Sequence, residues 1–453
     1  MFIPHTDADR ESMLAAIGKK DLNELFDVVP EKYRFPKLNL QPGLTEPEVT
    51  FLLDEISSAN LSLDHTACFT GAGAYHHYIP AAIDNLISRG DFYTAYTPYQ
   101  PEISQGTLQA VYEYQSLMAR LTGMEASNAS HYDGATACAE AGILAYHQYH
   151  GKRKKILVSA GLHPHYLLTL KTYLQDFDGM QIECPKAASL DEINPQRLEE
   201  KIDMDTALVL VQYPDFFGQI QDFSELAKAV HEKGSLLCVC INPIALGLLK
   251  TPGEMGADIV VGEGQPLGIP LSYGGPYLGI FTTRKELIRK VSGRIVGETV
   301  DNRGQRAYVL TLTAREQHIR REKATSNICS NQGLNALTAA IYLSLLGRNG
   351  LQAVAKLCYD KAHYAAKEIS KIHGYRILNQ RPFFHEFVVS CPQAPSDINQ
   401  HLLDHGMIGG YDLSEEYPML GNAMLIAVTE MINKEDIDDL CELLKEGEHH
   451  GRH

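Results

Sequence analysis

The sequence predicts an α/β protein, with a mostly parallel, doubly wound sheet in a large domain and a smaller α+β domain at the C-terminal end. Short apolar runs alternate with helical patterns over residues 125–283, and three more strand-like runs follow two long helical patterns. Runs that are apolar on both faces are typical of a parallel sheet covered by helices. The strands expected in this sheet are Ile156–Ala160, Ala207–Gln212, Leu236–Ile241, Asp258–Val261 and Tyr277–Phe281.

Composition excludes several classes of protein. The chain has 453 residues, 44% hydrophobic and 21% charged, which is ordinary for a folded protein and unlike disordered, collagen-like or coiled-coil chains. The formal charge of −16 repels phosphate backbones, so nucleic acid and anionic membranes are poor candidate partners. No apolar run approaches the roughly 20 residues that span a bilayer, and the acidic N-terminus lacks a signal pattern. We therefore expect a cytoplasmic protein.

The first 60 residues are expected to be a helical segment. Arg10–Phe26 carries apolar residues at helical spacing. Thr45 and Glu48 form a capping box, which predicts a helix that begins there and runs to about Ser58.

The remaining elements follow from the same signals. Asp222 and Glu225 mark the start of a helix that ends at Gly234. Residues 293–312 carry Gly and polar residues and are expected to be a connection or mobile loop. The expected elements after it are helices over 314–346 and 351–372, strands over 375–378, 384–390 and 424–428, and a helix over 434–445. The expected division is 1–60 helical, 61–312 large α/β domain, 313–446 α+β domain and 447–453 disordered tail.

Nine cysteines are scattered along the chain, and none forms a C-x-x-C pair. Cys238 and Cys240 are two residues apart in an apolar run, so they share one face of the expected strand. Buried thiols that pack as small hydrophobic groups are the favoured interpretation, and a disulfide framework is not expected in a chain of this size. We expect no metal site.

The segment Thr94–Gly106 is the densest cluster of polar and aromatic residues. Its prolines fix the backbone, which favours a rigid loop over a helix interior or a central strand. Such a loop can hold a small polar ligand, and a buried structural loop is an equally open interpretation. Its candidate ligand-facing residues are Tyr96, Thr97, Tyr99, Gln100, Glu102 and Gln105. His76, in a Gly-rich segment upstream, is expected by default to be packed or exposed at the surface.

Two further segments have polar patterns. Asn128–Glu140 is a turn of small residues that opens into a helix, where free N–H groups favour an anion. A phosphate-bearing cofactor could sit at Ser130, Gly134 and Thr136, although simple helix capping by Asp133 is favoured by the residues alone. Thr313–Cys329 is dense in charges of both signs. Its Arg315, Arg320 and Arg321 favour an interdomain or subunit contact over a solvated helix face.

The strand Leu236–Ile241 and the Gly-rich segment after it lack two residues that bind pyridoxal phosphate (PLP) in many enzymes of this architecture. In those enzymes, such a strand ends in an Asp, and a Lys about two dozen residues later forms a Schiff base. Here no Asp ends the strand, and no Lys occurs between Lys250 and Lys285. Gln265 stands where the Schiff-base Lys would fall, and an amide cannot form an imine. The scaffold is present without its covalent chemistry.

Several of these segments together resemble one family. From about Phe2 to about residue 446 the chain is similar to glycine dehydrogenase (decarboxylating), the P-protein of the glycine cleavage system, and specifically to subunit 1 of its two-subunit form. The stretches that carry the resemblance are FIPHTDADRESML, TAYTPYQPEISQG, NASHYDGATACAEA, DIVVGEGQPLGIPLSYGGPYLGIF and TAREQHIRREKATSNIC. They are long and specific, and they cover nearly the whole chain.

The resemblance implies a fold-type I, aminotransferase-like PLP scaffold and an obligate subunit of an enzyme that decarboxylates glycine. It implies that PLP is bound covalently by the partner subunit, and that the aminomethyl group passes to the lipoyl arm of the H-protein. A heterotetramer with two copies of each subunit is the implied assembly. The chain alone is expected to be inactive.

The resemblance also gives the candidate residues their implied roles. The Thr94–Gly106 residues, and more weakly His76, would form an active-site wall facing the partner's PLP. The turn with Ser130, Gly134 and Thr136 would be a vestigial phosphate site, and the three arginines would lie in an interface. Two other interpretations stay open: a self-contained PLP enzyme that uses Lys250 or Lys285, and a non-catalytic regulatory or scaffold subunit.

Overall fold

The chain divides into two units, Met1–Ser62 and Leu63–His453, in a computed structural model that describes residues 4–450. The first unit contains α1 (Asp7–Ala16), two short 3-10 turns, η1 (Leu22–Phe26) and η2 (Glu31–Tyr33), and α2 (Glu46–Ser58). The capping box of Thr45 and Glu48 is present as expected. Leu14 is the one buried hydrophobic side chain among this unit's described residues, so the unit builds no core of its own.

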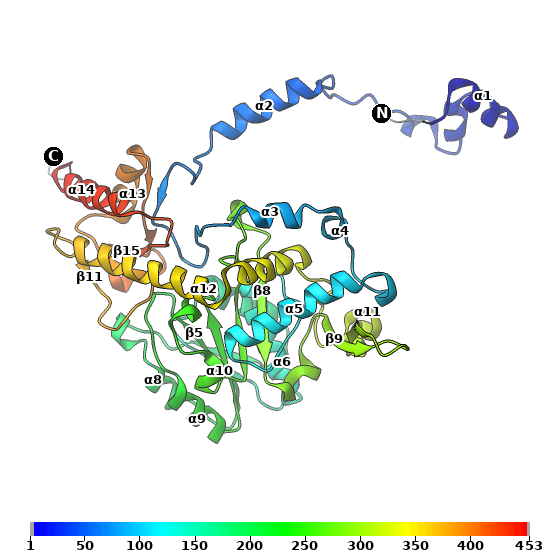
Figure 1. The fold of residues 1–453 in the computed structure, drawn as a ribbon. Helices are drawn as coiled ribbons and strands as arrows, with labels where there is room; N and C mark the ends of the chain where they lie inside the picture. Colours follow the sequence, from blue (N-terminus) through cyan, green and yellow to red (C-terminus); the bar gives the residue numbers. More distant parts are fainter. Residues whose placement is uncertain (1–3, 451–453) are drawn as a thin grey trace. The chain divides into compact units, whose positions relative to one another are not determined.

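The second unit is organised around a mostly parallel, seven-stranded sheet, which contains the five expected strands and two that were not expected, β2 and β4 (Figure 1). The strand order is β2-β8-β7-β6-β5-β3-β4, and the five strands from β7 to β4 are parallel. β8 and β2 join the edge in antiparallel pairs. The strands are β2 (Ala126–Ser127), β3 (Lys155–Val158), β4 (Gln181–Glu183), β5 (Thr206–Tyr213), β6 (Leu236–Ile241), β7 (Ile259–Glu263) and β8 (Gly279–Thr283).

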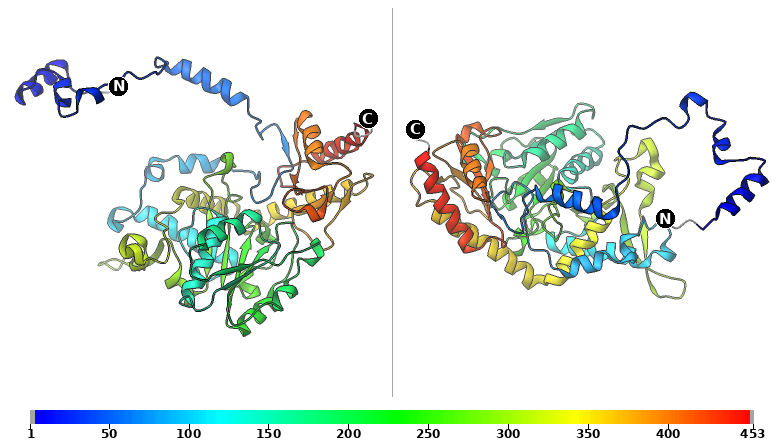
Figure 2. Two further views of the ribbon diagram at one scale, coloured as in Figure 1. Left: turned by 180° about the vertical axis from the view of Figure 1, so that it is seen from behind. Right: turned by 90° about the horizontal axis from the view of Figure 1, so that it is seen from above.

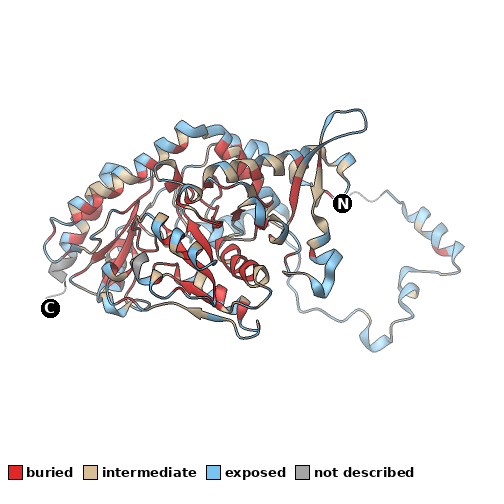
Figure 3. Ribbon diagram, turned by 90° about the horizontal axis from the view of Figure 1, so that it is seen from below, coloured by how far each residue is buried: buried red, intermediate tan, exposed pale blue. Residues whose placement is uncertain are grey.

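Helices cover both faces of this sheet, so the central strands β5 and β6 are almost completely buried, whereas the edge strand β4 is partly exposed (Figure 3). α6 (Gly134–Gln148) and α7 (Pro164–Leu174) pack on one face with Cys238 and Cys240, which confirms that the two thiols share a buried face. The other face packs against α9 (Ser224–Glu232) and α10 (Pro252–Met255). Alternate residues of β6 therefore pack into different cores. Cys238 and Cys240 pack on the α6 and α7 side, and Leu237 and Val239 pack on the α9 and α10 side.

Residues 293–312 form an antiparallel hairpin, so the expectation of a mobile loop is wrong. β9 (Ile295–Val300) pairs with β10 (Arg306–Thr311). The Asp301 carboxylate accepts hydrogen bonds from the backbone N–H groups of Arg303 and Gln305, and it thereby closes the turn. An Asp at the start of a turn is a sequence signal for a hairpin, but the Gly and polar residues around it favoured a loop.

The helix expected from residue 314 begins nineteen residues later, at Gly333. The charged segment forms only short turns: η8 (Thr313–Arg315), α11 (Gln317–Arg320) and η9 (Arg321–Lys323). Arg321 has a positive φ angle of 54°, which breaks the helical path. Ile319, the one large apolar side chain of α11, is 56% exposed. A stretch without an apolar face gains nothing by packing as a long helix.

The long helix α12 (Gly333–Ile369) runs from α5 (Gln105–Thr122), in the large domain, to α14 (Lys434–His450) in the C-terminal part (Figures 1 and 2). Gly347 interrupts it with φ 58° and ψ −170°, near the break expected between two helices. The C-terminal part adds an antiparallel sheet of order β11-β12-β15-β14. Its elements are β11 (Arg376–Ile377), β12 (Glu386–Ser390), α13 (Pro395–Asp404), β14 (Tyr411–Asp412) and β15 (Ala423–Ala427).

Several short elements complete the second unit. β1 (Ala67–Cys68) pairs in parallel with β13 (Met407–Ile408), which ties the start of the second unit to the C-terminal part. The smaller elements are α3 (Ala82–Ile87), α4 (Gly90–Tyr93), η3 (Pro101–Ile103), η4 (Leu190–Glu192), α8 (Pro195–Glu199), η5 (Ala245–Gly247), η6 (Ser272–Gly274), η7 (Lys285–Lys290) and η10 (Pro418–Leu420).

Helix α14 reaches His450, so it includes four residues of the segment expected to be a disordered tail. The last three residues, 451–453, lie outside the described part of the chain. Within residues 4–450, none of the helices combines the length and apolar character that crossing a membrane requires.

Candidate functional site

The loop Thr94–Gly106 lies at the surface between α4 and α5. Tyr96 is 83% exposed and Tyr99 is 50% exposed, while Gln100 and Glu102 are also exposed. Pro98 is the one fully buried residue of this loop among those described. The side chains that are most suited to contact a ligand therefore face outward, and the interpretation as a buried structural loop holds only for its anchor points.

A cavity of about 210 Å³ lies behind this loop and joins it to the segment that precedes α12. Tyr96 and Thr97 line it from one side, and Ser330 and Asn331 from the other. Phe92, Pro98, Val111, Leu334 and Leu337 give it an apolar floor and walls. The structure thus brings together two segments that are more than 200 residues apart in the sequence.

Arg294, which the sequence analysis did not single out, connects these two segments. It is 4% exposed and precedes β9. One guanidinium nitrogen donates to Tyr99 Oη at 3.5 Å, and another donates to Ser330 Oγ at 3.3 Å. The Tyr99 ring also contacts the His318 ring edge-on, with centroids 6.0 Å apart. The loop is therefore held from below by a buried cation.

Gln105 and His76, the two remaining residues predicted for the active-site wall, are bound to other parts of the chain. The Gln105 side chain accepts from the Tyr308 N–H at 2.9 Å and donates to the Tyr308 and Pro101 carbonyls, so it anchors α5 to β10. The His76 carbonyl accepts a hydrogen bond from Thr429 Oγ1 beside the C-terminal sheet. Burial lowers the pKa of His76. His76 is not among the residues that line the cavity behind the loop.

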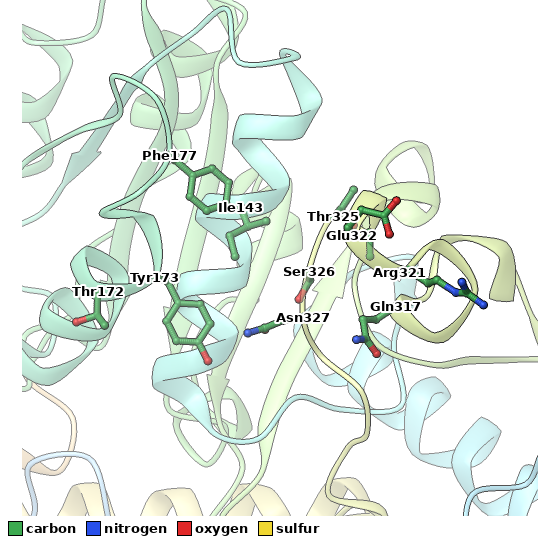
Figure 4. A pocket seen from close by; sticks show the side chains of 11 residues that line it. Ile143, Thr172, Tyr173, Phe177, Gln317, Arg321, Glu322, Thr325, Ser326 and Asn327 are labelled. Carbon is green, nitrogen blue, oxygen red and sulfur yellow. The ribbon is translucent and has the colours of Figure 1, made fainter.

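The three arginines of the charged segment lie in different environments. Arg315 is largely buried and donates to the Val291 carbonyl, and burial lowers its pKa. Arg320 is exposed and donates to the Ala314 carbonyl at 3.3 Å. Arg321 is exposed and lines a cavity of about 620 Å³. Figure 4 shows Phe177 and Tyr173 on the opposite wall of that cavity.

A second candidate position lies at the carboxyl ends of β5, β6 and β7, where doubly wound sheets usually bind ligands. The remaining space there is about 30 Å³. Gln212, Cys240, Asn242 and Glu263 contribute to its lining from the strand ends, together with His163 and Tyr166 from the segment that starts α7. No lysine lines this space among the described residues.

Gln265, at the position of the absent Schiff-base Lys, is a structural residue. Its side chain is 2% exposed. Gln265 Oε1 accepts from the Tyr75 N–H at 2.9 Å, and Nε2 donates to the carbonyls of Tyr75 and Ile269 at 2.9 and 2.8 Å. The amide therefore holds the segment around Tyr75 across the crevice.

Buried carboxyl groups surround this segment. Glu386 accepts from the Ala72 N–H and from Tyr75 Oη, both at 2.8 Å, and burial raises its pKa to about 7. Asp215 accepts from Phe217 and Gln219, and burial raises its pKa to about 7 as well. Neither group has an ion-pair partner within 4.0 Å among the described residues. These carboxyls belong to the packing of the crevice.

The turn expected to be a vestigial phosphate site is satisfied by the chain itself. Asp133 accepts from the Thr136 N–H at 2.7 Å in a capping box. Ser130 Oγ accepts from the Gln332 N–H at 3.1 Å. The Gly134 N–H donates to Glu263 Oε2 at 2.9 Å. Sequence reasoning assigned no role to Glu263, although an acidic residue at the end of a buried strand was the available signal.

One other group of side chains has metal-ligating atoms close together. His77, Cys358 and Glu430 place one such atom each within 4.8 Å of one another. His77 Nδ1 lies 2.7 Å from Glu430 Oε2, and Cys358 Sγ donates to the same oxygen at 3.3 Å. The atoms are thus already paired in a buried hydrogen-bonded cluster.

Sequence comparison places the whole chain in one group. Residues 1–444 match the family described as glycine cleavage system P-protein. The chain is 51% identical to the probable glycine dehydrogenase (decarboxylating) subunit 1 of Thermomicrobium roseum, over 98% of this chain and 99% of the relative. The protein of the same description from Desulforamulus reducens is also 51% identical, over 97% and 98%.

Comparison with solved structures gives the same grouping and a wider fold class. A crystal structure of glycine decarboxylase (P-protein) of the glycine cleavage system, in inhibitor-bound form, is 40% identical with a TM-score of 0.90, covering 99% of this chain and 100% of that one. Glutamate decarboxylase of Lactobacillus brevis, at 14% identity, has a TM-score of 0.68 and covers 94% and 97%. The fold is that of the fold-type I PLP-dependent enzymes, which confirms the predicted class.

Proposed function

Because this chain belongs to the glycine cleavage system P-protein family, we propose that it is the subunit that completes the enzyme without anchoring its cofactor. Its relatives are named subunit 1, a name that implies a second subunit. In the proposed assembly, with two copies of each subunit, the partner subunit binds PLP covalently. Together they decarboxylate glycine and transfer the aminomethyl group to the lipoyl arm of the H-protein.

The crevice of this chain does not fit PLP, and this observation carries the proposal. The space at the carboxyl ends of β5 to β7 is about 30 Å³, roughly the volume of one water, whereas cofactor pockets are usually about 300–1,000 Å³. Gln265 replaces the required amine and is fully hydrogen-bonded. Glu263 occupies the N–H group of Gly134, which a phosphate would need.

The alternative of a self-contained PLP enzyme is not supported by the two nearest lysines in the sequence. Lys250 Nζ lies at the surface, where it donates to Ser224 Oγ at 2.9 Å and contacts Asp222 at 3.3 Å. Lys285 is also exposed, and it follows β8, the strand next to the edge strand β2. Neither residue lines the crevice. The remaining alternative, a non-catalytic scaffold, predicts that the loop substitutions described below affect assembly only.

The part of this chain that we assign to the shared active site is the exposed face of Thr94–Gly106. Tyr96 and Thr97 lie at the mouth of the cavity behind the loop, and Tyr99 is held by Arg294. Hydroxyl groups and the Glu102 carboxylate can orient a small polar substrate and exclude water at a subunit boundary. These groups would position the substrate and take no part in covalent chemistry. Gln105 supports this wall from behind, because its side chain is already bound to Tyr308 and Pro101.

The test is a glycine–bicarbonate exchange assay with PLP and lipoylated H-protein, run on this chain alone, on the partner subunit alone and on the mixture. Exchange in the mixture only is the expected result. Exchange by this chain alone would refute the assignment, because it would require a lysine that binds the cofactor here. Equal exchange by the partner with and without this chain would favour the scaffold interpretation.

A further inference from the structure

Glu263 is the last residue of β7, and its carboxyl group lies where three backbone segments meet. Oε2 accepts from the Gly134 N–H at 2.9 Å. Oε1 accepts from the N–H groups of Gln265 at 2.9 Å and Leu278 at 3.0 Å. The side chain is 8% exposed and forms no ion pair among the described residues. It is held entirely by backbone donors.

The first of these donors belongs to a helix end that favours negative charge. Gly134 begins α6, a helix of 15 residues, and the free N–H groups of such an end carry a partial positive charge. The end is closely packed, because a Cβ atom at Gly134 would lie 2.3 Å from Tyr166 Oη and 2.9 Å from the Glu263 nitrogen. Phosphate groups are bound at helix ends of this kind. Here a carboxyl group from the same chain is bound instead.

The rest of the crevice is closed by paired side chains. The His163 and Tyr166 rings are stacked, with centroids 4.8 Å apart and planes inclined by 19°. His163 Nδ1 accepts from the His165 N–H, and Nε2 donates to the Ala72 carbonyl. Both ring nitrogens are therefore occupied, and burial lowers the pKa of His163 to about 4. A planar ligand would have to displace these groups.

We propose that Glu263 is a built-in substitute for a cofactor phosphate. Its carboxyl group permanently fills the anion position at the start of α6, and the chain folds with this crevice closed to PLP and to free phosphate. The proposal deepens the proposed function and rests on it, since it explains how a subunit of this fold dispenses with its own cofactor. It also predicts which ligand the position accepts when Glu263 is removed: a small carboxylate.

The experiment is chemical rescue in the full-length chain. Glu263→Ala leaves the three backbone donors facing a hole of the size of acetate. Burial raises the pKa of Glu263 to about 8, although the three N–H donors act to lower this pKa. The measurements are therefore made near pH 9, where the native carboxyl group is ionised. The melting temperature of the variant should fall by about 3–6 °C. Acetate should restore at least half of this loss.

The controls separate a specific anion from general effects. Acetamide has the same shape as acetate without the charge. At equal concentration and ionic strength, it should restore much less of the lost melting temperature than acetate does. Glu286→Ala removes an exposed glutamate, and its melting temperature should respond to acetate as the native chain does. Equal rescue by acetamide and acetate, or a Glu263→Ala chain as stable as the native one, would overturn the proposal.

A second measurement does not depend on a variant that folds. Equilibrium dialysis of the native full-length chain against inorganic phosphate and against PLP, with a melting curve at each concentration, should show no saturable uptake and no stabilisation. Saturable PLP uptake that raises the melting temperature would overturn the proposal, even if exchange activity still requires the partner subunit. Exchange by this chain alone would instead refute the proposed function, so the two failures are distinguishable.

Discussion

Arg294 holds Tyr99 from beneath the exposed loop: the guanidinium carbon lies 5.8 Å from the ring centroid, and a guanidinium nitrogen donates to the hydroxyl at 3.5 Å. The same guanidinium donates to Ser330 Oγ, and its Nε has no partner among the described atoms. Burying a cation without a carboxylate partner costs free energy of folding. The hydrogen bonds to Tyr99 and Ser330 offset part of this cost. Together with the Gln105 hydrogen bonds, Arg294 fixes the position of the loop from beneath.

Substitution of this arginine should loosen the loop. Arg294→Lys keeps the charge but loses the planar fork that reaches both Tyr99 and Ser330, so the free energy of unfolding should fall by about 1–3 kcal/mol. Urea denaturation followed by circular dichroism measures this change. Arg306→Lys is the matched control, since Arg306 is exposed and pairs with Glu298 at the surface, and it should change stability by less than about 0.5 kcal/mol. Equal losses in the two variants would contradict the argument.

The exposed face of the loop should matter for turnover and not for folding. Tyr96 is 83% exposed and Glu102 is exposed, so Tyr96→Ala combined with Glu102→Gln removes no internal packing. In the mixed complex we expect glycine–bicarbonate exchange to fall about tenfold or more, because misplacement of reacting groups is costly. The mass of the complex and the melting temperature of this chain should stay unchanged.

The matched control for the loop is Tyr78→Ala, a tyrosine that is 59% exposed and outside the candidate wall. It should leave exchange activity within about twofold of the native complex. If the double loop variant also keeps full activity, the assignment of the wall to Thr94–Gly106 is wrong. Failure of the double variant to assemble with the partner subunit would point to the scaffold interpretation.

The central strands of the seven-stranded sheet were predictable because they are buried on both faces. Uninterrupted apolar runs such as Leu236–Ile241 carry a strong signal, and the structure assigns that strand the same bounds. The hairpin of β9 and β10 was missed because its strands are partly exposed and contain glycine and charged residues. The charged segment was wrongly expected to be helical, since local charge spacing resembles a helix even where no apolar face exists.

The candidate site was only partly readable from sequence. Gln265 could be recognised as a lost lysine, because the identity of a single residue excludes an imine. Arg294 and Glu263 were assigned no role, because Ser330, Tyr99 and Gly134, the partners that define their positions, are 36 to 195 residues away in the sequence. Gln105 was placed among the ligand-facing residues, yet its amide binds Tyr308, 203 residues later. Contacts of this kind depend on the tertiary fold and leave no local pattern.

The buried Glu386 should make the protein less stable as pH rises. Burial raises the pKa of this carboxyl to about 7 from about 4.5 in the unfolded chain, so the folded state binds the proton more tightly. The contribution of Glu386 to stability should therefore be fully present below about pH 4.5 and be lost as pH rises through about 7. Glu386→Gln should lose less stability between pH 5 and pH 8 than the native chain, by on the order of 1–3 kcal/mol, in urea denaturation curves. An unchanged pH slope would contradict this role.

The pair of His77 and Glu430 should give the opposite dependence at acid pH. Burial works to raise the pKa of Glu430, but the hydrogen bond and charge of His77 outweigh it and lower this pKa to about 2. The unfolded carboxyl therefore binds protons at higher pH than the folded one. The stabilisation should be present above about pH 4.5 and be lost as pH falls toward 2.

Glu430→Gln removes the charge while it keeps a similar shape, so it isolates this contribution. Near neutral pH the variant should lose about 1–3 kcal/mol of unfolding free energy, since a buried partner of His77 is lost. The loss should shrink as pH falls from about 5 to about 3, because the native carboxyl then differs less from the amide. Glu416→Gln, which changes an exposed glutamate that lies 3.7 Å from His165, should change stability by less than about 0.5 kcal/mol at every pH. A loss for Glu430→Gln that is constant with pH would show that the carboxylate charge is not the cause.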